Sequence, residues 1–170
     1  MSTQPTADLL FRNARPSDVD AIMSLVQRRI EWMDAKGLHQ WNETDYFGRY
    51  PRRYWQDNIG RFLVGLRGAS VVVAIALYES DIRWEGTGAN GPAFYLHHLT
   101  TDLSAKGAGA AMMLYVERYA AAHGVTTLRL DSAVGNEVLE RYYSALGYRE
   151  RGRCQDRLYH GILREKRLAV

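Results

Sequence analysis

Two glycines open the stretch of this chain with the clearest chemical potential. Gly107 and Gly109 follow Phe94–Thr101, which is rich in the aromatic and β-branched residues that strands prefer, and they precede a run of good helix formers. A helix start carries unpaired N–H groups and a partial positive charge, and glycine lets a ligand approach the backbone closely. The stretch is therefore a candidate site for a phosphate or pyrophosphate group.

The same glycines have a simpler interpretation, in which they only mark a tight turn between a strand and a helix. Short glycine motifs match by chance, and this one is not a dinucleotide fingerprint because the third glycine and the later acidic residue are not at the required positions. It is not a P-loop either, since no Gly-Lys-Ser/Thr follows at the required spacing. From these residues alone, both interpretations stay open.

Two adjacent histidines in the predicted strand are candidates for proton exchange. Alternate residues of a strand share a face, so His97 is expected beside Leu99 and His98 on the opposite face beside Thr100. An imidazole titrates near neutral pH, which suits a general base. The alternative is a packed histidine that forms a hydrogen bond within the sheet.

Length and composition predict one globular domain over residues 1–170, with residues 1–8 as a flexible tail. The hydrophobic content of 46% is enough for a core, and no apolar run approaches the ~20 residues of a membrane helix. The N-terminus lacks the pattern of a secretory signal. A single cysteine, Cys154, excludes an intramolecular disulfide and is expected to be an ordinary free thiol. These features predict a cytoplasmic protein.

The chain is mildly basic, with a net charge of +3 and a pI of about 9.1. Eight basic residues crowd the last thirty positions: Arg141, Arg149, Arg151, Arg153, Arg157, Arg164, Lys166 and Arg167. Such a segment forms a solvated surface or meets a polyanionic small molecule. Zinc-finger spacing and an aromatic-interleaved RNA motif are both missing from the sequence, so nucleic acid is not an expected partner.

The hydrophobic pattern predicts elements that alternate along the whole chain. The predicted strands are Leu9–Asn13, Arg61–Leu66, Ser70–Tyr78 with an extension over Asp81–Trp84, Phe94–Thr101, Val125–Leu130, Tyr148–Cys154 and Arg157–Leu163. The predicted helices run from a cap at Ser17 or Asp18 to Gly37, from the glycine loop to Gly124, and over Asn136–Leu146. This order predicts an α/β (α+β) single domain with a mixed, mostly antiparallel twisted sheet and helices on both faces.

The segment from Leu38 to Asn58 differs in composition, because it combines aromatic residues with Asn, Asp and Arg. Its aromatic residues are Trp41, Tyr46, Tyr50, Tyr54 and Trp55. One interpretation is a helical connector whose rings cover the core. The other is a wall of a substrate pocket, since aromatic rings pack well against small organic ligands.

Over nearly its whole length the chain resembles the GNAT superfamily of acyl-CoA-dependent N-acetyltransferases. Members carry a Gln/Arg-x-x-Gly-x-Gly/Ala loop after a strand, which here corresponds to Ser104-Ala105-Lys106-Gly107-Ala108-Gly109. Later they carry an Asn, and seven residues on a Tyr, in a helix that ends in a Leu-Gly-Phe-like turn. Asn136 and Tyr143 have that separation, and Leu146-Gly147-Tyr148 supplies the turn. The order and spacing of the two motifs make the resemblance specific.

The resemblance implies a GNAT-like fold and an N-acetyltransferase that moves an acetyl group from acetyl-CoA to a primary amine of a small molecule. Acetyl-CoA would be the cosubstrate, and no metal would be needed. Tyr143 would act as the general acid at the donor sulfur, and His97 as the general base. The implied donor-binding residues are Leu99, Thr100, Thr101, Ser104, Ala105, Lys106, Gly107, Ala108, Gly109, Ala110, Asn136 and Tyr143. A peptide N–H within Leu99–Thr101 would polarise the thioester carbonyl.

Asn136 would bind the pantetheine arm of the donor, although its place at a helix start fits an N-cap equally well. The acceptor side is implied less directly, through Trp41, Tyr46, Glu79 and His98. His98 is the reserve candidate for the base. Glu79 and Asp81 are weaker candidates that would also bind a cationic amine. The resemblance leaves a homodimer open, and it predicts no membrane partner.

Two departures from the family pattern lie in the donor loop. Ser104 stands where Gln or Arg is usual, and the segment before Gly107 is about two residues shorter than usual. Backbone amides can still hold a pyrophosphate without that side chain. The departures keep two alternatives open. One is an acyltransferase of the same fold that uses a longer acyl-CoA, an acyl carrier or an aminoacylated RNA as donor. The other is a non-catalytic CoA-binding module.

Overall fold

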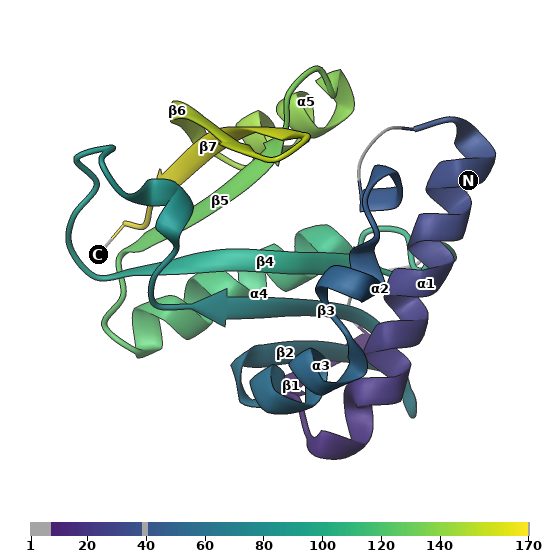
Figure 1. Ribbon diagram of the computed structural model, residues 1–170. Helices are drawn as coiled ribbons and strands as arrows, with labels where there is room; N and C mark the ends of the chain where they lie inside the picture. The colour runs from purple at the N-terminus through teal and green to yellow at the C-terminus, as the bar shows by residue number, and fades with distance from the viewer. Residues whose placement is uncertain (1–7, 39–40, 170) are drawn as a thin grey trace. The chain divides into compact units, whose positions relative to one another are not determined.

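The computed structural model describes residues 8–38 and 41–169, without the side chain of Trp41. Seven strands form one sheet in the order β1-β2-β3-β4-β5-β7-β6 (Figure 1). Among the described pairings, β4 with β5 is parallel and the others are antiparallel. The mixed, mostly antiparallel sheet is therefore confirmed. The predicted flexible tail lies outside the described residues, apart from its last residue.

The chain divides into two compact units. The first comprises Met1–Ala76 and His98–Tyr115, and the second comprises Leu77–His97 and Val116–Val170. The strands β3 and β4 and the helix α4 each contribute to both units. The single domain over 1–170 stays a prediction.

The first unit holds the N-terminal elements of the sheet and the helices that follow β1. Their bounds are β1 Leu9–Asn13, α1 Val19–Lys36, α2 Tyr46–Arg49, α3 Arg52–Asn58, β2 Phe62–Arg67 and most of β3 Ser70–Tyr78. The α1 helix ends at Gly37, which adopts a left-handed φ of 64° that glycine tolerates without strain. β2 and β3 consist almost entirely of buried residues, as expected for strands covered on both faces.

The start of α1 differs from the expected cap. The Asp18 carboxylate makes no cap hydrogen bond to the helix and instead accepts from Arg12 at 2.7 and 3.0 Å and from the Arg15 N–H at 2.7 Å. The hydrogen bond from Arg12 is the main reason why the pKa of Asp18 lies below its usual value. A short 3-10 helix, Pro16–Asp18, precedes α1, so Asp18 anchors the end of β1 to the start of the helix.

The second unit carries the C-terminal elements. Their bounds are the end of α4 Ala108–Ala122, β5 Thr127–Ala133, α5 Glu137–Ala145, β6 Arg149–Asp156 and β7 Tyr159–Arg167. Three predictions differ here, and the first is the last strand, which runs over Tyr159–Arg167 and not over Arg157–Leu163. Asp81–Trp84 does not extend β3, because Ile82–Trp84 is a 3-10 helix whose first turn is capped by the Asp81 carboxylate. β5 continues through Asp131–Ala133, since antiparallel pairing with β7 reaches Ala133.

Candidate functional site

The predicted donor loop lies in the first unit, between the end of β4, Ala93–Thr101, and the start of α4. Gly107 adopts a left-handed φ of 82°, which turns the chain into the helix. The first helical hydrogen bond runs from the Ala111 N–H to the Gly107 carbonyl at 3.0 Å. The N–H groups of Gly109 and Ala110 belong to the first turn, where no acceptor is available within a helix. These donors and the helix dipole suit an anion.

Ser104 takes part in a hydrogen-bond network inside the loop. Its N–H and its hydroxyl both donate to Oδ1 of Asp102, at 2.9 and 2.6 Å. These hydrogen bonds hold the pKa of Asp102 below its usual value. Ser104, which stands where Gln or Arg is usual, therefore stabilises the loop through Asp102, and its contact with the donor stays a prediction.

Two arginines of α1 contact this loop, and the sequence analysis missed both. Arg28 forms an ion pair with Asp102 at 3.0 Å. Arg29 donates to the Thr101 carbonyl at 2.8 Å and to the Thr101 hydroxyl at 2.5 Å. Burial lowers the pKa of Arg29. Both partners are more than seventy residues away in sequence, so no local motif could have indicated these contacts.

Within β4, His98 has a positive φ of 56°. Such a conformation is uncommon for a residue other than glycine. The buried residues of β4 are Ala93, Leu96 and Thr100. Leu96 and Thr100 are four residues apart, and the sharing of faces predicted for the residues before and after His98 stays a prediction.

His98 lies among aromatic rings of the first unit. The His98 cluster consists of His98 with Tyr46, Tyr50, Tyr54, Trp55 and Phe62, whose ring centroids lie 4.8–6.1 Å from that of the histidine. The Tyr46 hydroxyl contacts Nδ1, and the Tyr54 hydroxyl contacts Nε2 at 2.9 Å. Because a neutral imidazole has one donor and one acceptor nitrogen, one tyrosine donates and the other accepts.

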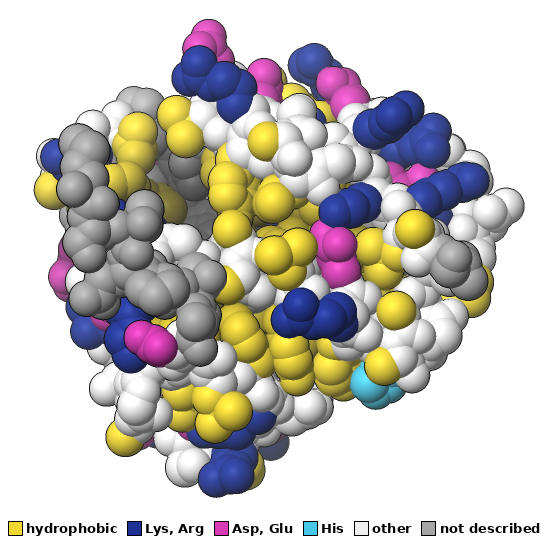
Figure 2. Space-filling model, turned by 180° about the vertical axis from the view of Figure 1, so that it is seen from behind, with side chains coloured by type: hydrophobic (Ala, Val, Ile, Leu, Met, Phe, Trp, Pro, Cys, Tyr) yellow, Lys and Arg dark blue, Asp and Glu magenta, His cyan; other side chains and the backbone are white. Residues whose placement is uncertain are grey.

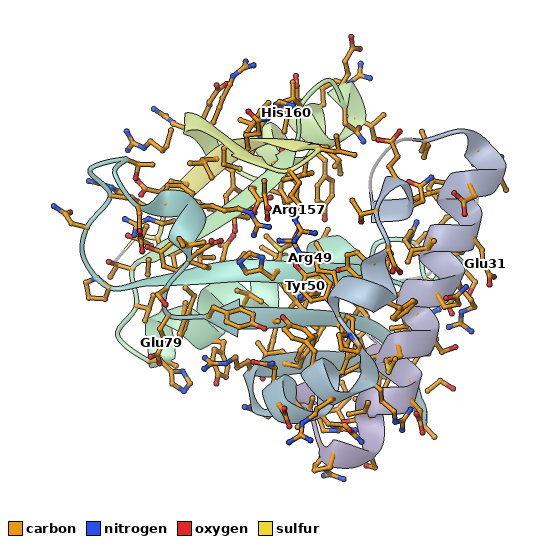
Figure 3. The ribbon with its side chains drawn as sticks, in the orientation of Figure 1. Glu31, Arg49, Tyr50, Glu79, Arg157 and His160 are labelled. Carbon is orange, nitrogen blue, oxygen red and sulfur yellow. The ribbon has the colours of Figure 1, made fainter. Side chains whose placement is uncertain are left out.

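The aromatic segment thus covers the core, as one of its two interpretations predicted. Tyr46 is 8% exposed and Trp55 is 1% exposed. Figure 3 shows Arg49 and Tyr50 next to each other, with the guanidinium 5.6 Å from the ring centroid. A substrate-binding role for Tyr46 stays a prediction, and the side chain of Trp41 lies outside the described part of the chain.

His97 lies in the second unit and pairs with Asp81. Its Nε2 is 2.9 Å from Oδ2 of Asp81, whose side chain is 6% exposed, while the histidine is 20% exposed. The other oxygen of Asp81 accepts from the Arg83 N–H at 2.9 Å. The carboxylate is thus fixed by the 3-10 helix that follows it, and it fixes the imidazole in turn.

The electrostatics of this pair favour an ionised carboxylate. Burial alone would raise the pKa of Asp81, but the hydrogen bonds from His97 and from the Arg83 N–H outweigh it, so the pKa lies below its usual value. A carboxylate on Nε2 holds the proton of the neutral ring on that nitrogen, which makes Nδ1 the basic one. It also stabilises the imidazolium that forms when the ring takes a proton.

A second carboxylate, Asp131, completes the group that we name the carboxylate–histidine cluster, Asp81, His97 and Asp131. Their side-chain oxygen and nitrogen atoms lie within 4.8 Å of one another. The Tyr159 hydroxyl donates to Asp131 at 2.6 Å. Imidazole and carboxylate are also metal ligands, but one oxygen of each carboxylate is already hydrogen-bonded to His97 or Tyr159.

Sequence reasoning ended the strand at Leu130, with Asp131 in the loop that follows, and it missed both Asp131 and Tyr159. The sequence held part of the evidence for Asp131, because a polar residue follows the apolar run of β5. Burial raises the pKa of Tyr159, and the neighbouring Asp131 adds to this effect. The phenol therefore stays protonated and serves as a fixed donor to the carboxylate.

Tyr143 lies on α5 in the second unit, with its ring centroid 5.2 Å from that of Tyr142 and 5.9 Å from that of Tyr148. Burial raises the pKa of Tyr143 well above its ordinary value, and Tyr142 and Asp131 act in the same direction. Asn136 caps α5, since its side-chain oxygen accepts from the Leu139 N–H at 3.1 Å. The N-cap role is confirmed, and the pantetheine contact stays a prediction.

Two further residues of the second unit were named in the sequence analysis: Glu79, which is exposed, and Cys154, whose thiol stays protonated. Glu79 is exposed at the end of β3 (Figure 3), and Asp81, two residues later, is the carboxylate that reaches His97. Burial raises the pKa of the Cys154 thiol to about 11, so this side chain stays protonated near neutral pH.

The basic C-terminal residues are interleaved with acidic partners. Arg151 and Arg167 approach Glu165 at 3.1 and 3.7 Å, Arg153 approaches Glu150 at 3.5 Å, and Lys166 approaches Glu117 at 2.5 Å. Figure 2 likewise shows basic side chains spread over one face with acidic ones among them. In the described part of the chain no helix is long and apolar enough to cross a bilayer.

Comparison with known proteins agrees with this architecture. The uncharacterised N-acetyltransferase YesJ of Bacillus subtilis is 24% identical over 77% of this chain and 76% of its own length. A GNAT-family acetyltransferase from Streptococcus agalactiae matches with a TM-score of 0.79 and 19% identity, over 95% of this chain and 96% of its own. The PaiA N-acetyltransferase from Thermoplasma acidophilum, solved in complex with coenzyme A, matches with a TM-score of 0.71 and 18% identity, over 94% and 98%.

The two structural likenesses establish the fold. The family is established by sequence, because the family model described as "Acetyltransferase (GNAT) family" matches residues 27–148, which include Arg28 and Arg29, the donor loop, the carboxylate–histidine cluster and Tyr143. The protein therefore belongs to the acetyltransferase (GNAT) family and is an acyltransferase.

Proposed function

We propose that this acyltransferase moves an acetyl group from acetyl-CoA to a primary amine of a small molecule, with the Asp81–His97 pair as its general base. The observation that carries the proposal is the 2.9 Å contact between Nε2 of His97 and Oδ2 of a buried, ionised Asp81. A base that is oriented by a third group is the arrangement that proton abstraction from a nucleophile requires.

The residues of the donor loop fit the cosubstrate. The backbone N–H groups at the start of α4 would hold the pyrophosphate, and the left-handed Gly107 lets the phosphates approach the backbone. Support comes from the PaiA N-acetyltransferase, whose structure contains coenzyme A. In this arrangement Ser104 stabilises the loop through its two hydrogen bonds to Asp102.

The proposed reaction assigns each residue one task. His97 takes a proton from the acceptor amine, whose nitrogen then forms a bond to the thioester carbonyl carbon. A peptide N–H within Leu99–Thr101 stabilises the oxyanion. The carbon–sulfur bond breaks as the amide forms, the second proton of the attacking nitrogen passes through solvent to the departing thiolate, and Tyr143 donates a hydrogen bond to that sulfur. Asp81 and Asp131 bring negative charge to the site, which favours a cationic amine as the acceptor.

Donor binding gives the direct test of this proposal. Calorimetry with coenzyme A is expected to show one site per chain, and Lys106→Glu is expected to weaken it about tenfold at low salt, because a charge beside the phosphates is reversed. Lys36→Glu, at the exposed end of α1, is the matched control and should bind as the wild type does. The absence of binding at millimolar coenzyme A would contradict the proposal.

One observation supports an acyl donor other than acetyl-CoA as the alternative. Ser104 stands where the family usually has Gln or Arg, and its hydroxyl donates to Asp102 within the loop. A competition assay with acetyl-CoA, longer acyl-CoAs and an acyl carrier separates the alternatives. If a donor other than acetyl-CoA gives the highest kcat/KM, that donor replaces acetyl-CoA in the proposal.

Asp81→Asn tests the positioning role of the carboxylate. The substitution keeps the shape and the cap on Arg83 but removes the charge that stabilises the imidazolium. We expect kcat to fall on the order of 10²-fold, because the imidazolium loses its counter-charge. Glu85→Gln is the control, because that carboxylate is exposed and lies outside the cluster. A loss of kcat that is matched by a loss of folded protein in a melting curve would indicate a structural role only.

A further inference from the structure

Arg29 of α1 is partly buried against the end of β4, and the proposed reaction assigns it no task. Its Nη2 donates to the Thr101 carbonyl at 2.8 Å and to the Thr101 hydroxyl at 2.5 Å. The guanidinium carbon also lies 5.2 Å from the Trp32 ring centroid. Because hydrogen bonds from a charged donor are stronger than neutral ones, these contacts fix the guanidinium beside the residue that leads into the donor loop.

Part of the Arg29 guanidinium is still available to a ligand. A guanidinium carries N–H donors on three nitrogens, and only Nη2 is used by Thr101. Among the described residues, Nε and Nη1 have no hydrogen-bond acceptor, and neither atom is fully enclosed. These N–H groups can therefore meet a group that comes from solution.

The charges around the donor loop leave a positive excess. Asp102 is ionised, since the hydrogen bonds from Ser104 hold its pKa below the usual value, and Arg28 pairs with it at 3.0 Å. The charges of Arg29 and Lys106 are then in excess. Position 104 itself holds an uncharged serine where Gln or Arg is usual in the family. A positive charge from α1 therefore stands near a loop whose motif lacks one.

The partial burial of Arg29 favours an anionic partner. Burial lowers the pKa of Arg29, and the charge of Asp102 offsets only part of this effect. A cation withdrawn from water is unfavourable unless an opposite charge or enough acceptors compensate it. A phosphate group supplies both, and its oxygens match the planar fork of N–H donors that arginine presents.

Arg29 is also close enough to the start of α4 for its charge to act there. Two consecutive turns connect Asp102 to α4, closed by hydrogen bonds from the Ala105 N–H to the Asp102 carbonyl and from the Ala108 N–H to the Ala105 carbonyl, both 3.1 Å. A turn brings residues three apart to within about 7 Å, so Asp102 lies within roughly 14 Å of Ala108. A pyrophosphate bound at the helix start occupies part of this span. The remaining separation is comparable with the Debye length of about 10 Å at 0.1 M salt.

We propose that Arg29 is a donor-binding residue, which supplies from α1 a positive charge for the phosphate groups of coenzyme A. Its Nη2 stays on Thr101, while Nε and Nη1 face the donor. The inference rests on the proposed function, because it takes coenzyme A as the ligand of the loop. It adds a residue that lies outside the loop and outside the family motif.

Calorimetry with coenzyme A at two salt concentrations tests the role of this charge. Arg29→Gln is expected to raise the Kd at least about tenfold at low ionic strength, because glutamine can still donate to Thr101 but carries no charge. The difference should shrink to less than about threefold in roughly 0.5 M sodium chloride, where the Debye length is only about 4 Å. Arg29→Lys keeps the charge and is expected to recover most of the affinity.

Lys36→Gln is the matched control, because it removes the same charge from the exposed end of α1, about 10 Å further along the helix. It should bind as the wild type does. Melting curves confirm folding, and Arg29→Met, which keeps an apolar stem against Trp32, replaces Arg29→Gln if the glutamine variant does not fold.

Three results would overturn the proposal: an unchanged Kd in Arg29→Gln, a loss of equal size at both salt concentrations, or an equal loss in Arg29→Lys. The last two would assign Arg29 a structural role only. A wild-type protein that does not bind coenzyme A would instead contradict the proposed function, so the two failures are distinguishable.

Discussion

Replacement of His97 by Gln is expected to lower kcat/KM by about 10²- to 10⁴-fold near neutral pH, the usual contribution of a general base. Glutamine can still accept or donate a hydrogen bond but cannot take a proton from an ammonium group. Since Asp81 is ionised and buried beside Nε2, the loss of the ring also leaves that carboxylate without its main partner. The measurement is the steady-state rate with an amine acceptor, combined with a melting curve to confirm folding.

The direction in which activity changes with pH depends on which group takes the proton of the acceptor amine. In the wild type the imidazole takes the proton, so activity falls as pH drops and the ring becomes charged. In His97→Gln the acceptor must lose its own proton, and an alkylamine does so only near pH ~10. The deficit should therefore be largest at low and neutral pH and shrink as pH rises. A deficit that stays constant with pH would exclude His97 as the base.

His160→Gln and His98→Gln are the controls. His160 is exposed on β7 and should be neutral in both activity and stability. His98 is held by two tyrosine hydroxyls within the His98 cluster, so its replacement should lower the melting temperature more than kcat. A larger loss of kcat from His98→Gln than from His97→Gln would exchange the roles of the two histidines.

These adjacent histidines show where sequence reasoning was sufficient and where it was not. Periodicity and turn residues predicted β1 with the observed bounds, predicted β3 apart from the extension over Asp81–Trp84, and placed the end of α1 at Gly37. The strand rule did not predict the positive φ of His98. A local conformation held by an aromatic cluster from another part of the chain leaves no periodic signal in the strand itself.

The partners of the candidate catalytic residues were also beyond a local pattern. Asp81 was predicted within a strand, whereas a 3-10 helix turns it toward His97, sixteen positions later in the sequence. Asp131 was assigned to a loop because the apolar run of β5 ends at Leu130, yet pairing with β7 extends the strand. Family motifs predicted single residues such as Tyr143 and His97, and tertiary pairing supplied the groups that hold or polarise them.

Tyr143→Phe is expected to lower kcat by about 10- to 100-fold and to leave the dissociation constant of coenzyme A unchanged. Phenylalanine retains the ring that packs against Tyr148 at 5.9 Å, so the change removes only the hydroxyl. The raised pKa of Tyr143 keeps this hydroxyl protonated but makes full transfer of its proton to a thiolate unfavourable. A hydrogen bond to the leaving sulfur is therefore the expected contribution, and such bonds to charged groups contribute about 1.5–3 kcal/mol.

The size of the effect separates this role from that of a full proton donor, which would contribute about 10²- to 10⁴-fold and add a basic limb to the pH–rate profile. Tyr142→Phe is the matched control, because that phenol is the neighbouring residue on α5 and is also partly buried, with a pKa raised by burial. Turnover and calorimetry on the two variants decide the question. If Tyr143→Phe keeps wild-type kcat while Tyr142→Phe does not, the hydroxyl at the leaving sulfur is that of Tyr142. If neither variant loses turnover, the thiolate departs without a phenol and the family-derived role of Tyr143 does not apply to this chain.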